Sequence, residues 1–256
     1  MAKARVAVLR APGTNCDVET AFAFELAGAQ AECIHINEFI RGKKLIQDYQ
    51  ILTVPGGFTY GDDISAGKIL ANELRLKLAD DIKKFIGDGK LVLGICNGFQ
   101  VLAKAGILPA LSDTGSQQLT LAINDSGKFE CRWVYLSVDE TSPCVFTKGL
   151  KHIYLPVAHA EGKVVADAKI LHRLNVVLKY SDETGNTEAG YPYNPNGSIL
   201  NIAGICDESG RVFALMPHPE RYISGVQHPR WTREEPKEFG DGFSIFQNAV
   251  KWAAKL

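Results

Sequence analysis

The apolar positions of the first hundred residues form short runs separated by amphipathic stretches. Four such runs are typical of strands that are buried on both faces of a sheet, and they occupy residues 5–9, 31–36, 49–54 and 91–95. Helical spacing of apolar residues lies between them. One helix is predicted from a cap at Asp17 to Gly28, and another over residues 68–86. This alternation predicts an α/β fold, a mostly parallel doubly wound sheet flanked by helices.

The pattern changes after Gly106. From about 112 to 201 the helical periodicity fades, and β-rich pieces such as 131–138 and 176–180 alternate with clusters of turn residues. We expect this stretch to add antiparallel strands to the main sheet. A hairpin over 199–216 and a terminal helix over 243–254 follow it. We find no repeat or linker, and therefore expect one domain over 1–256 with a β-rich insertion.

Composition narrows the class of protein. The 256 residues carry 28 basic and 29 acidic side chains, a balance that does not favour nucleic acid as a partner. The six cysteines include no C-x-x-C pair, and we therefore expect neither a metal site nor a disulfide framework. The opening apolar run is too short for a signal peptide or a membrane span. A cytoplasmic enzyme without membrane contact is the resulting expectation.

Cys96 is the strongest candidate for chemistry. It ends the apolar run 91–95, and Gly94 and Gly98 flank it at Gly-x-Cys-x-Gly spacing before a helix predicted from Phe99. This is the layout of a nucleophile elbow, in which a strained turn lifts one side chain above the sheet. A helix N-terminus also favours a thiolate. The alternative is a buried structural cysteine, which is what most free cysteines are.

A thiol nucleophile needs a base and a group that orients the base. His218 and Glu220 follow the apolar run 212–216 within Met-Pro-His-Pro-Glu, where two prolines favour extended backbone. Residues two apart then point the same way, and the carboxylate can fix the imidazole tautomer. Donors for an oxyanion are expected from the amides of Asn97 and of Gly57 in Pro55-Gly56-Gly57.

A search for a nucleotide-binding loop finds none. Residues 61–68 resemble a phosphate loop, but the glycines are five residues apart and Ile69 stands where Ser or Thr should bind magnesium. Residues 10–16 follow the first strand as a dinucleotide loop would, yet they lack G-x-G-x-x-G. We therefore expect no cofactor in this chain.

Together these motifs resemble the triad-type (class I) glutamine amidotransferases, whose fold is flavodoxin-like. Within this family, Asn97 after the cysteine, the stretch 56–63 and His218-Pro-Glu-Arg221 are similar to the glutaminase subunits of phosphoribosylformylglycinamidine synthase. The likeness runs nearly the full length and includes residues 10–16 and 156–162. These motifs identify the family only when taken together, because the nucleophile motif around Cys96 alone indicates only the superfamily.

The resemblance implies hydrolysis of glutamine to glutamate and ammonia through a thioester on Cys96, with His218 moving protons and Glu220 orienting it. It implies a glutamine pocket formed by six residues: Gly56, Gly57, Asn97, Gln100, His159 and Glu161. Ammonia would pass to a large synthetase subunit that binds ATP and Mg²⁺ and makes formylglycinamidine ribonucleotide in purine biosynthesis.

Some questions stay open at this point. The segment 224–242 is longer than a compact glutaminase needs, and could be a surface loop or a partner-docking segment. It leaves open whether the complex includes a small third subunit. Another Cys-His-Glu hydrolase of the same fold and a non-catalytic regulatory module are the alternative functions. Roles for Cys16 and Cys33 are not assigned.

Overall fold

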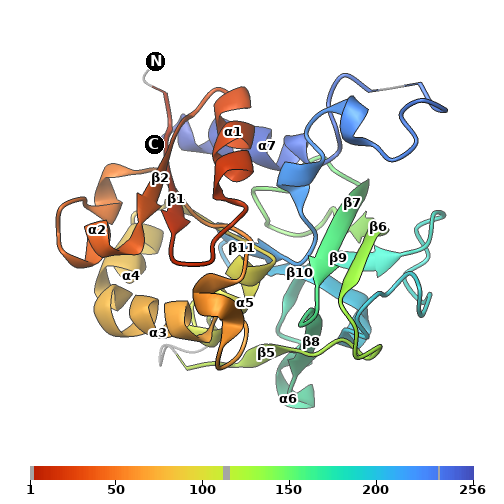
Figure 1. Ribbon diagram of the computed structural model, residues 1–256, viewed down its shortest axis with the longest axis horizontal. Coiled ribbons are helices and arrows are strands. Elements are labelled where there is room, and N and C mark those ends of the chain that lie inside the picture. Colours follow the sequence, from red (N-terminus) through yellow and green to blue (C-terminus); the bar gives the residue numbers. More distant parts are fainter. Residues whose placement is uncertain (1–2, 112–115, 236) are drawn as a thin grey trace.

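A computed structural model describes residues 3–111, 116–235 and 237–256, and its centre is a nine-stranded sheet in the order β2-β1-β3-β4-β11-β10-β9-β6-β7. The first five strands in that order are parallel neighbours (Figure 1). They are β2 (Gln30–His35), β1 (Arg5–Arg10), β3 (Ile51–Val54), β4 (Leu91–Ile95) and β11 (Val212–Leu215). Every residue of β3, β4 and β11 is buried, as expected of strands covered on both faces.

The other half of the sheet is antiparallel. It contains β10 (Ile202–Cys206), β9 (Asn175–Ser181), β6 (Glu130–Val138) and β7 (His152–His159). A separate two-stranded sheet pairs β5 (Leu119–Ala122) with β8 (Lys163–Ala166), and α6 (Ala168–Leu171) follows it. The predicted mixed α/β fold and the β10–β11 hairpin are confirmed. The predicted start of the insertion at about residue 112 lies outside the described residues.

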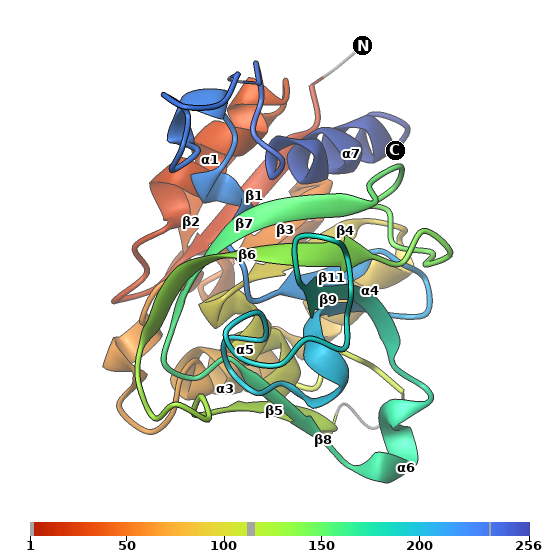
Figure 2. The same cartoon turned by 90° about the vertical axis from the view of Figure 1, so that its right-hand side faces the viewer.

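Helices cover both faces of the parallel half. Helices α1 (Asp17–Leu26) and α7 (Phe243–Ala253) pack on one face (Figure 2). The opposite face carries α3 (Lys68–Lys77), α4 (Ala79–Gly87) and α5 (Asn97–Lys104), while α2 (Ile36–Ile40) follows β2. The connection from β1 to β2 runs along the sheet in the opposite direction to that from β3 to β4. Right-handed crossovers therefore place their helices on opposite faces.

Two local predictions are wrong. The helix predicted over 68–86 is two helices, because Leu78 leaves helical geometry with φ −132° and ψ 11°. Its apolar stripe nevertheless stays buried on both pieces. Asp17 does not cap the first helix: it is the first helical residue, and its carboxylate pairs with Arg10 at 2.5 Å. Cys16, one residue earlier, occupies the N-cap position.

None of the helices in the described ranges is long and apolar enough to cross a membrane.

Candidate active site

Cys96 stands on a strained turn between β4 and α5. Its backbone has φ 50° and ψ −104°, a conformation that residues with side chains rarely adopt. The two flanking glycines are explained by close approach. A Cβ on Gly98 would lie 1.9 Å from the carbonyl oxygen of Val54, and one on Gly94 would lie 2.7 Å from Leu102. The geometry is that of a nucleophile elbow, as the spacing predicts.

The order of the sheet brings His218 to the same edge. Strand β11 pairs in parallel with β4, so the segments that leave their carboxyl ends emerge together. The Cys96 amide donates to the carbonyl of Leu215 at 2.8 Å, and the His218 amide donates to the carbonyl of Pro156 at 2.8 Å. Nδ1 of His218 lies 2.6 Å from Oε1 of Glu220, and both side chains are buried. Cys96, His218 and Glu220 therefore form one constellation.

Electrostatics at His218 favour the imidazolium. Burial lowers the pKa of His218, but the charges of Glu220 and Cys96 and hydrogen bonds to Cys16 and Cys96 outweigh burial and raise the pKa well above its ordinary value. The Cys16 and Cys96 sulfurs that raise this pKa lie near the ring, but among the described residues buried Nε2 has no partner aligned for a hydrogen bond. This ring nitrogen is thus available to exchange a proton with the Cys96 sulfur or with a substrate.

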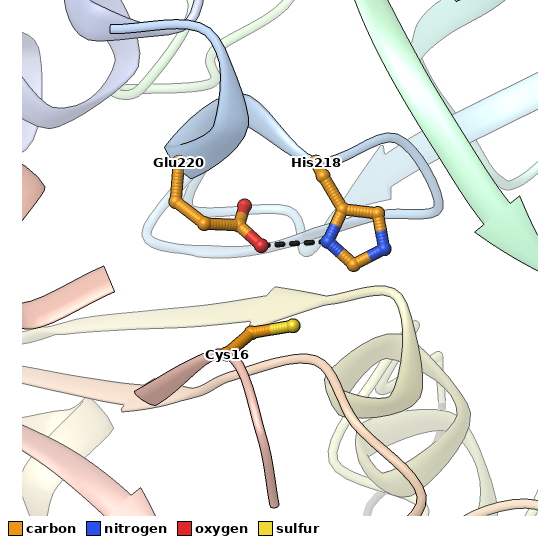
Figure 3. A group of neighbouring side chains, drawn as sticks. All are labelled: Cys16, His218 and Glu220. Atoms are coloured by element: carbon orange, nitrogen blue, oxygen red, sulfur yellow. Dashed lines mark hydrogen bonds and ion pairs between the residues drawn. The ribbon is translucent and has the colours of Figure 1, made fainter. Parts of the chain in front are cut away.

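Cys16 lies beside the His–Glu pair, on the side of the segment that follows β1 (Figure 3). Its sulfur and the ligand atoms of His218 and Glu220 all lie within 4.8 Å of one another, a set that could hold a metal ion. However, Nδ1 and Oε1 are already engaged with each other, and a guanidinium nitrogen of Arg221 donates to the Cys16 sulfur at 3.1 Å. These contacts favour a hydrogen-bonded cluster.

The Gly56-Gly57 turn lies between these groups. A Cβ on Gly56 would come within 2.8 Å of the His218 ring and 3.1 Å of the Cys16 sulfur, so only glycine allows this packing. Gly57 has φ 147°, where a side chain would strain the backbone. Within the described residues, the N–H groups of Gly57 and Asn97 donate to no acceptor. Both are free to bind an oxyanion.

A small cavity of about 50 Å³ adjoins Cys96, and its lining includes Gly57, Gln100, His159 and Glu161. The Gln100 amide donates to the Glu161 carbonyl at 2.6 Å, which ties two of its walls together. His159 is buried, and burial together with the nearby His218 lowers its pKa to about 3. At neutral pH this ring is therefore uncharged. Of the predicted site residues, Cys96, Gly57, Gln100, His159 and Glu161 therefore line one cavity. Gly56, Asn97, His218 and Glu220 are not among its lining residues.

Sequence reasoning missed other residues of this site. Asp62 lines the cavity, and burial raises its pKa. Lys104, which is 7% exposed, lies 3.9 Å from the Glu161 carboxylate, and burial lowers its pKa. Asp62 stands in a turn-rich stretch with no pattern that marks it as buried, and a lysine at a helix end usually faces solvent. A buried position on the predicted helix face was the available signal for Lys104.

The segment 224–242 packs against the antiparallel strands. Three aromatic rings surround His228, those of Trp133, Tyr154 and Tyr222, with centroid distances of 5.6–5.8 Å. A capping box at Ser224 opens the segment. Residue 236 lies outside the described part. These contacts fix the described part of the segment near β6 and β7 and do not distinguish a loop from a docking element.

Comparisons with known proteins agree with this geometry. The model of the CobB/CobQ-like glutamine amidotransferase domain matches residues 3–253. A chain from Dehalococcoides mccartyi, named phosphoribosylformylglycinamidine synthase subunit PurQ, is 54% identical and aligns over 100% of both chains. This chain belongs to the PurQ family of glutamine amidotransferases. A Methanococcus maripaludis PurQ subunit is 44% identical, with 98% of each chain covered.

Solved structures support the same conclusion. A chain in the structure of PurLQS from Thermotoga maritima has a TM-score of 0.76 and 34% identity, with 98% of this chain and 99% of that chain covered. A glutamine amidotransferase from Thermotoga maritima, at 15% identity and a TM-score of 0.54, supports the fold alone. The family is that of the glutaminase subunits of phosphoribosylformylglycinamidine synthase, in purine biosynthesis. The alternatives of another Cys-His-Glu hydrolase of the same fold and of a non-catalytic regulatory module are not supported.

Proposed function

We propose that Cys96, His218 and Glu220 are the catalytic triad of this glutaminase subunit. The observation that carries the proposal is the strained Cys96 elbow beside a buried His218–Glu220 pair joined at 2.6 Å. The Cys96 sulfur attacks the side-chain carbonyl of glutamine and forms a tetrahedral oxyanion. His218 gives a proton to the leaving nitrogen, and ammonia departs from a γ-glutamyl thioester. Water, deprotonated by His218, then hydrolyses the thioester to glutamate.

The cavity residues bind and orient the substrate in this proposal. The amides of Gly57 and Asn97 stabilise the oxyanion, because both N–H groups are free and both flank the nucleophile. Gln100, His159 and Glu161 contact the amino-acid end of glutamine, and Gly56 lets the His218 ring approach this turn. His159 is neutral and therefore acts as a hydrogen-bonding group rather than as a second base.

Ammonia passes to a synthetase subunit that binds ATP and Mg²⁺ and converts formylglycinamide ribonucleotide to formylglycinamidine ribonucleotide in the cytoplasm. The likeness to a chain of a PurLQS structure supports a large synthetase partner and also a small third subunit. The segment 224–242 does not by itself indicate whether that third subunit belongs to the complex. We infer that all three subunits assemble and that the glutaminase is weak without them.

The test is steady-state ammonia release from glutamine, measured for the chain alone and with its cognate synthetase subunits. The assembled wild-type protein should release ammonia, the isolated chain much less, and Cys96→Ala none in either state, because the thioester needs the sulfur. Cys131→Ala is the matched control, since Cys131 is exposed on β6. Glutaminase activity of wild-type level in Cys96→Ala would refute the assignment of the nucleophile. Full activity without partners would refute the dependence on assembly.

A further inference from the structure

The Asn97 side chain is the centre of a buried hydrogen-bond network beside the nucleophile. The side chain is buried (1% exposed), and its carboxamide makes four hydrogen bonds. Oδ1 accepts from the backbone N–H of Thr59 at 3.3 Å and from its hydroxyl at 2.7 Å. Nδ2 donates to Asp62 at 3.3 Å and to Gln100 at 2.8 Å. Two acceptor and two donor positions are all that a carboxamide has, so its orientation is fully determined.

The segment that Asn97 holds is strained. Residues Tyr60, Gly61 and Asp62, which lie three to five positions after Gly57, all have positive φ between 54° and 70°. A run of left-handed residues with side chains persists only where surrounding contacts impose it. Thr59 and Asp62, the two residues bonded by Asn97, lie on either side of Tyr60 and Gly61. One side chain thus pins the strained turn at both ends.

Other contacts also hold this segment: the Tyr60 hydroxyl donates to the Glu73 carboxylate at 2.6 Å, and the Gly67 N–H donates to Asp62 at 3.1 Å. The N–H groups of Phe58 and Tyr60 donate to the carbonyls of Gly13 and Pro12 at 2.9 and 2.7 Å. These bonds tie the segment to the loop after β1, which does not carry the nucleophile. Asn97, by contrast, follows Cys96 directly at the start of α5. Its side chain therefore links the Gly57 turn to the same turn of backbone that carries the sulfur.

We infer that Asn97 is a positioning residue whose side chain sets the Gly57 amide relative to the Cys96 sulfur. This role is separate from that of the Asn97 backbone N–H, and it rests on the triad and oxyanion donors proposed above. The bond to Gln100 extends the linkage to the far wall of the cavity, because Gln100 donates to the Glu161 carbonyl. A single carboxamide thereby aligns both walls with the nucleophile.

Substitution of Asn97 by an apolar residue separates this role from triad chemistry. In Asn97→Leu the Thr59 groups lose their partner while Asp62 keeps the N–H of Gly67, and the strained turn is free to relax at its Thr59 end. We expect kcat for glutamine hydrolysis in the assembled synthase to fall roughly 10²-fold, the cost of one oxyanion donor. KM should change far less than kcat, because Gln100 stays held by its bond to the Glu161 carbonyl and binding of ground-state glutamine does not require the oxyanion donor. Alkylation of Cys96 by iodoacetamide needs no oxyanion donor and should keep its rate.

Two further variants complete the experiment. Asn248→Leu is the matched control, because the Asn248 carboxamide on α7 also bonds two backbone carbonyls, those of Phe146 and Lys148, away from the site. Thr59→Val removes only the hydroxyl contact and serves if Asn97→Leu fails to fold. For Thr59→Val we expect about a tenfold fall in kcat with unchanged alkylation.

The outcomes are distinct. A fall in kcat with alkylation retained supports the positioning role. A kcat within twofold of wild type, or alkylation that falls as much as kcat, overturns it, because the second result is what a general loss of structure produces. Failure of the proposed function looks different: the wild-type synthase itself would then release no ammonia from glutamine.

Discussion

Glu220→Gln removes one charge from the buried centre of the proposed triad and changes almost nothing in volume. Glu220 is 1% exposed, and its Oε1 lies 2.6 Å from Nδ1 of His218. A glutamine there can present its N–H₂ group to Nδ1 and so favour the wrong tautomer of the imidazole. Loss of the comparable carboxylate in a Ser-His-Asp triad lowers kcat about 10⁴-fold. We expect a loss of roughly 10²–10⁴-fold here, or about 3–5 kcal/mol of transition-state stabilisation.

The sign of the pH effect follows from His218. Burial lowers the pKa of His218, and the Glu220 charge is the largest influence that raises it. Without that charge, burial gains weight and the imidazolium loses its proton at a lower pH. The pKa of His218 should therefore be lower in the variant than in the wild-type protein. Because an imidazolium favours a neighbouring thiolate, alkylation of Cys96 in the variant should be slower at pH values where only the wild-type ring carries the proton.

The assay combines kcat for glutamine hydrolysis with iodoacetamide alkylation as a function of pH. Glu140→Gln is the matched control, because Glu140 is exposed and pairs only with Lys151 at the surface. It should leave both measurements unchanged. Thermal unfolding of each variant shows that the fold is retained. An unchanged kcat and an unchanged alkylation profile in Glu220→Gln would remove Glu220 from the triad.

Two further predictions concern the turn and the cavity. Gly57→Ala should lower kcat roughly 10²–10³-fold, because a Cβ at φ 147° would lie 2.8 Å from the Asn15 nitrogen. Gly127→Ala is the control, because Gly127 also has a positive φ but has open space around it. Equal activity of the two variants would contradict the role of Gly57. The pKa of His159 is lowered from 6.5 to about 3. The free energy of unfolding should therefore decrease as pH falls between those values, because the unfolded chain binds a proton at His159 that the folded chain does not bind. The full effect is about 5 kcal/mol. Urea unfolding of His159→Gln should therefore show a shallower decline of stability toward acid, and parallel curves for the two proteins would rule this effect out.

Much of the site could be predicted from the sequence because its chemistry sits at strand ends. Cys96 and His218 each follow an apolar run directly, and the edge of a parallel sheet at which such runs end is known from the fold class alone. The break at Leu78 could not be predicted, since no Gly or Pro marks it. The same is true of the Asp17–Arg10 pair, which depends on where a loop turns.

Contacts between loops are the second feature that could not be predicted from the sequence. Cys16 approaches His218 only because the segment after β1 lies against the Gly56-Gly57 turn, and the sequence pattern carries no trace of that approach. The Asn97 contacts with Thr59 and Asp62 are of the same kind. Periodicity reports which face of an element is buried. It does not report which loops touch across the end of a sheet.

The place of β11 in the sheet has a consequence for biosynthesis. Val212 pairs with Val92, so a central strand comes from the last part of the chain and completes a sheet begun more than a hundred residues earlier. Such pairing between distant segments closes late in folding. As the ribosome extends the polypeptide, the sulfur emerges long before the imidazole that would activate it. A nascent or truncated product that ends before β11 has Cys96 but lacks His218 and Glu220, and under the proposed triad it is expected not to hydrolyse glutamine.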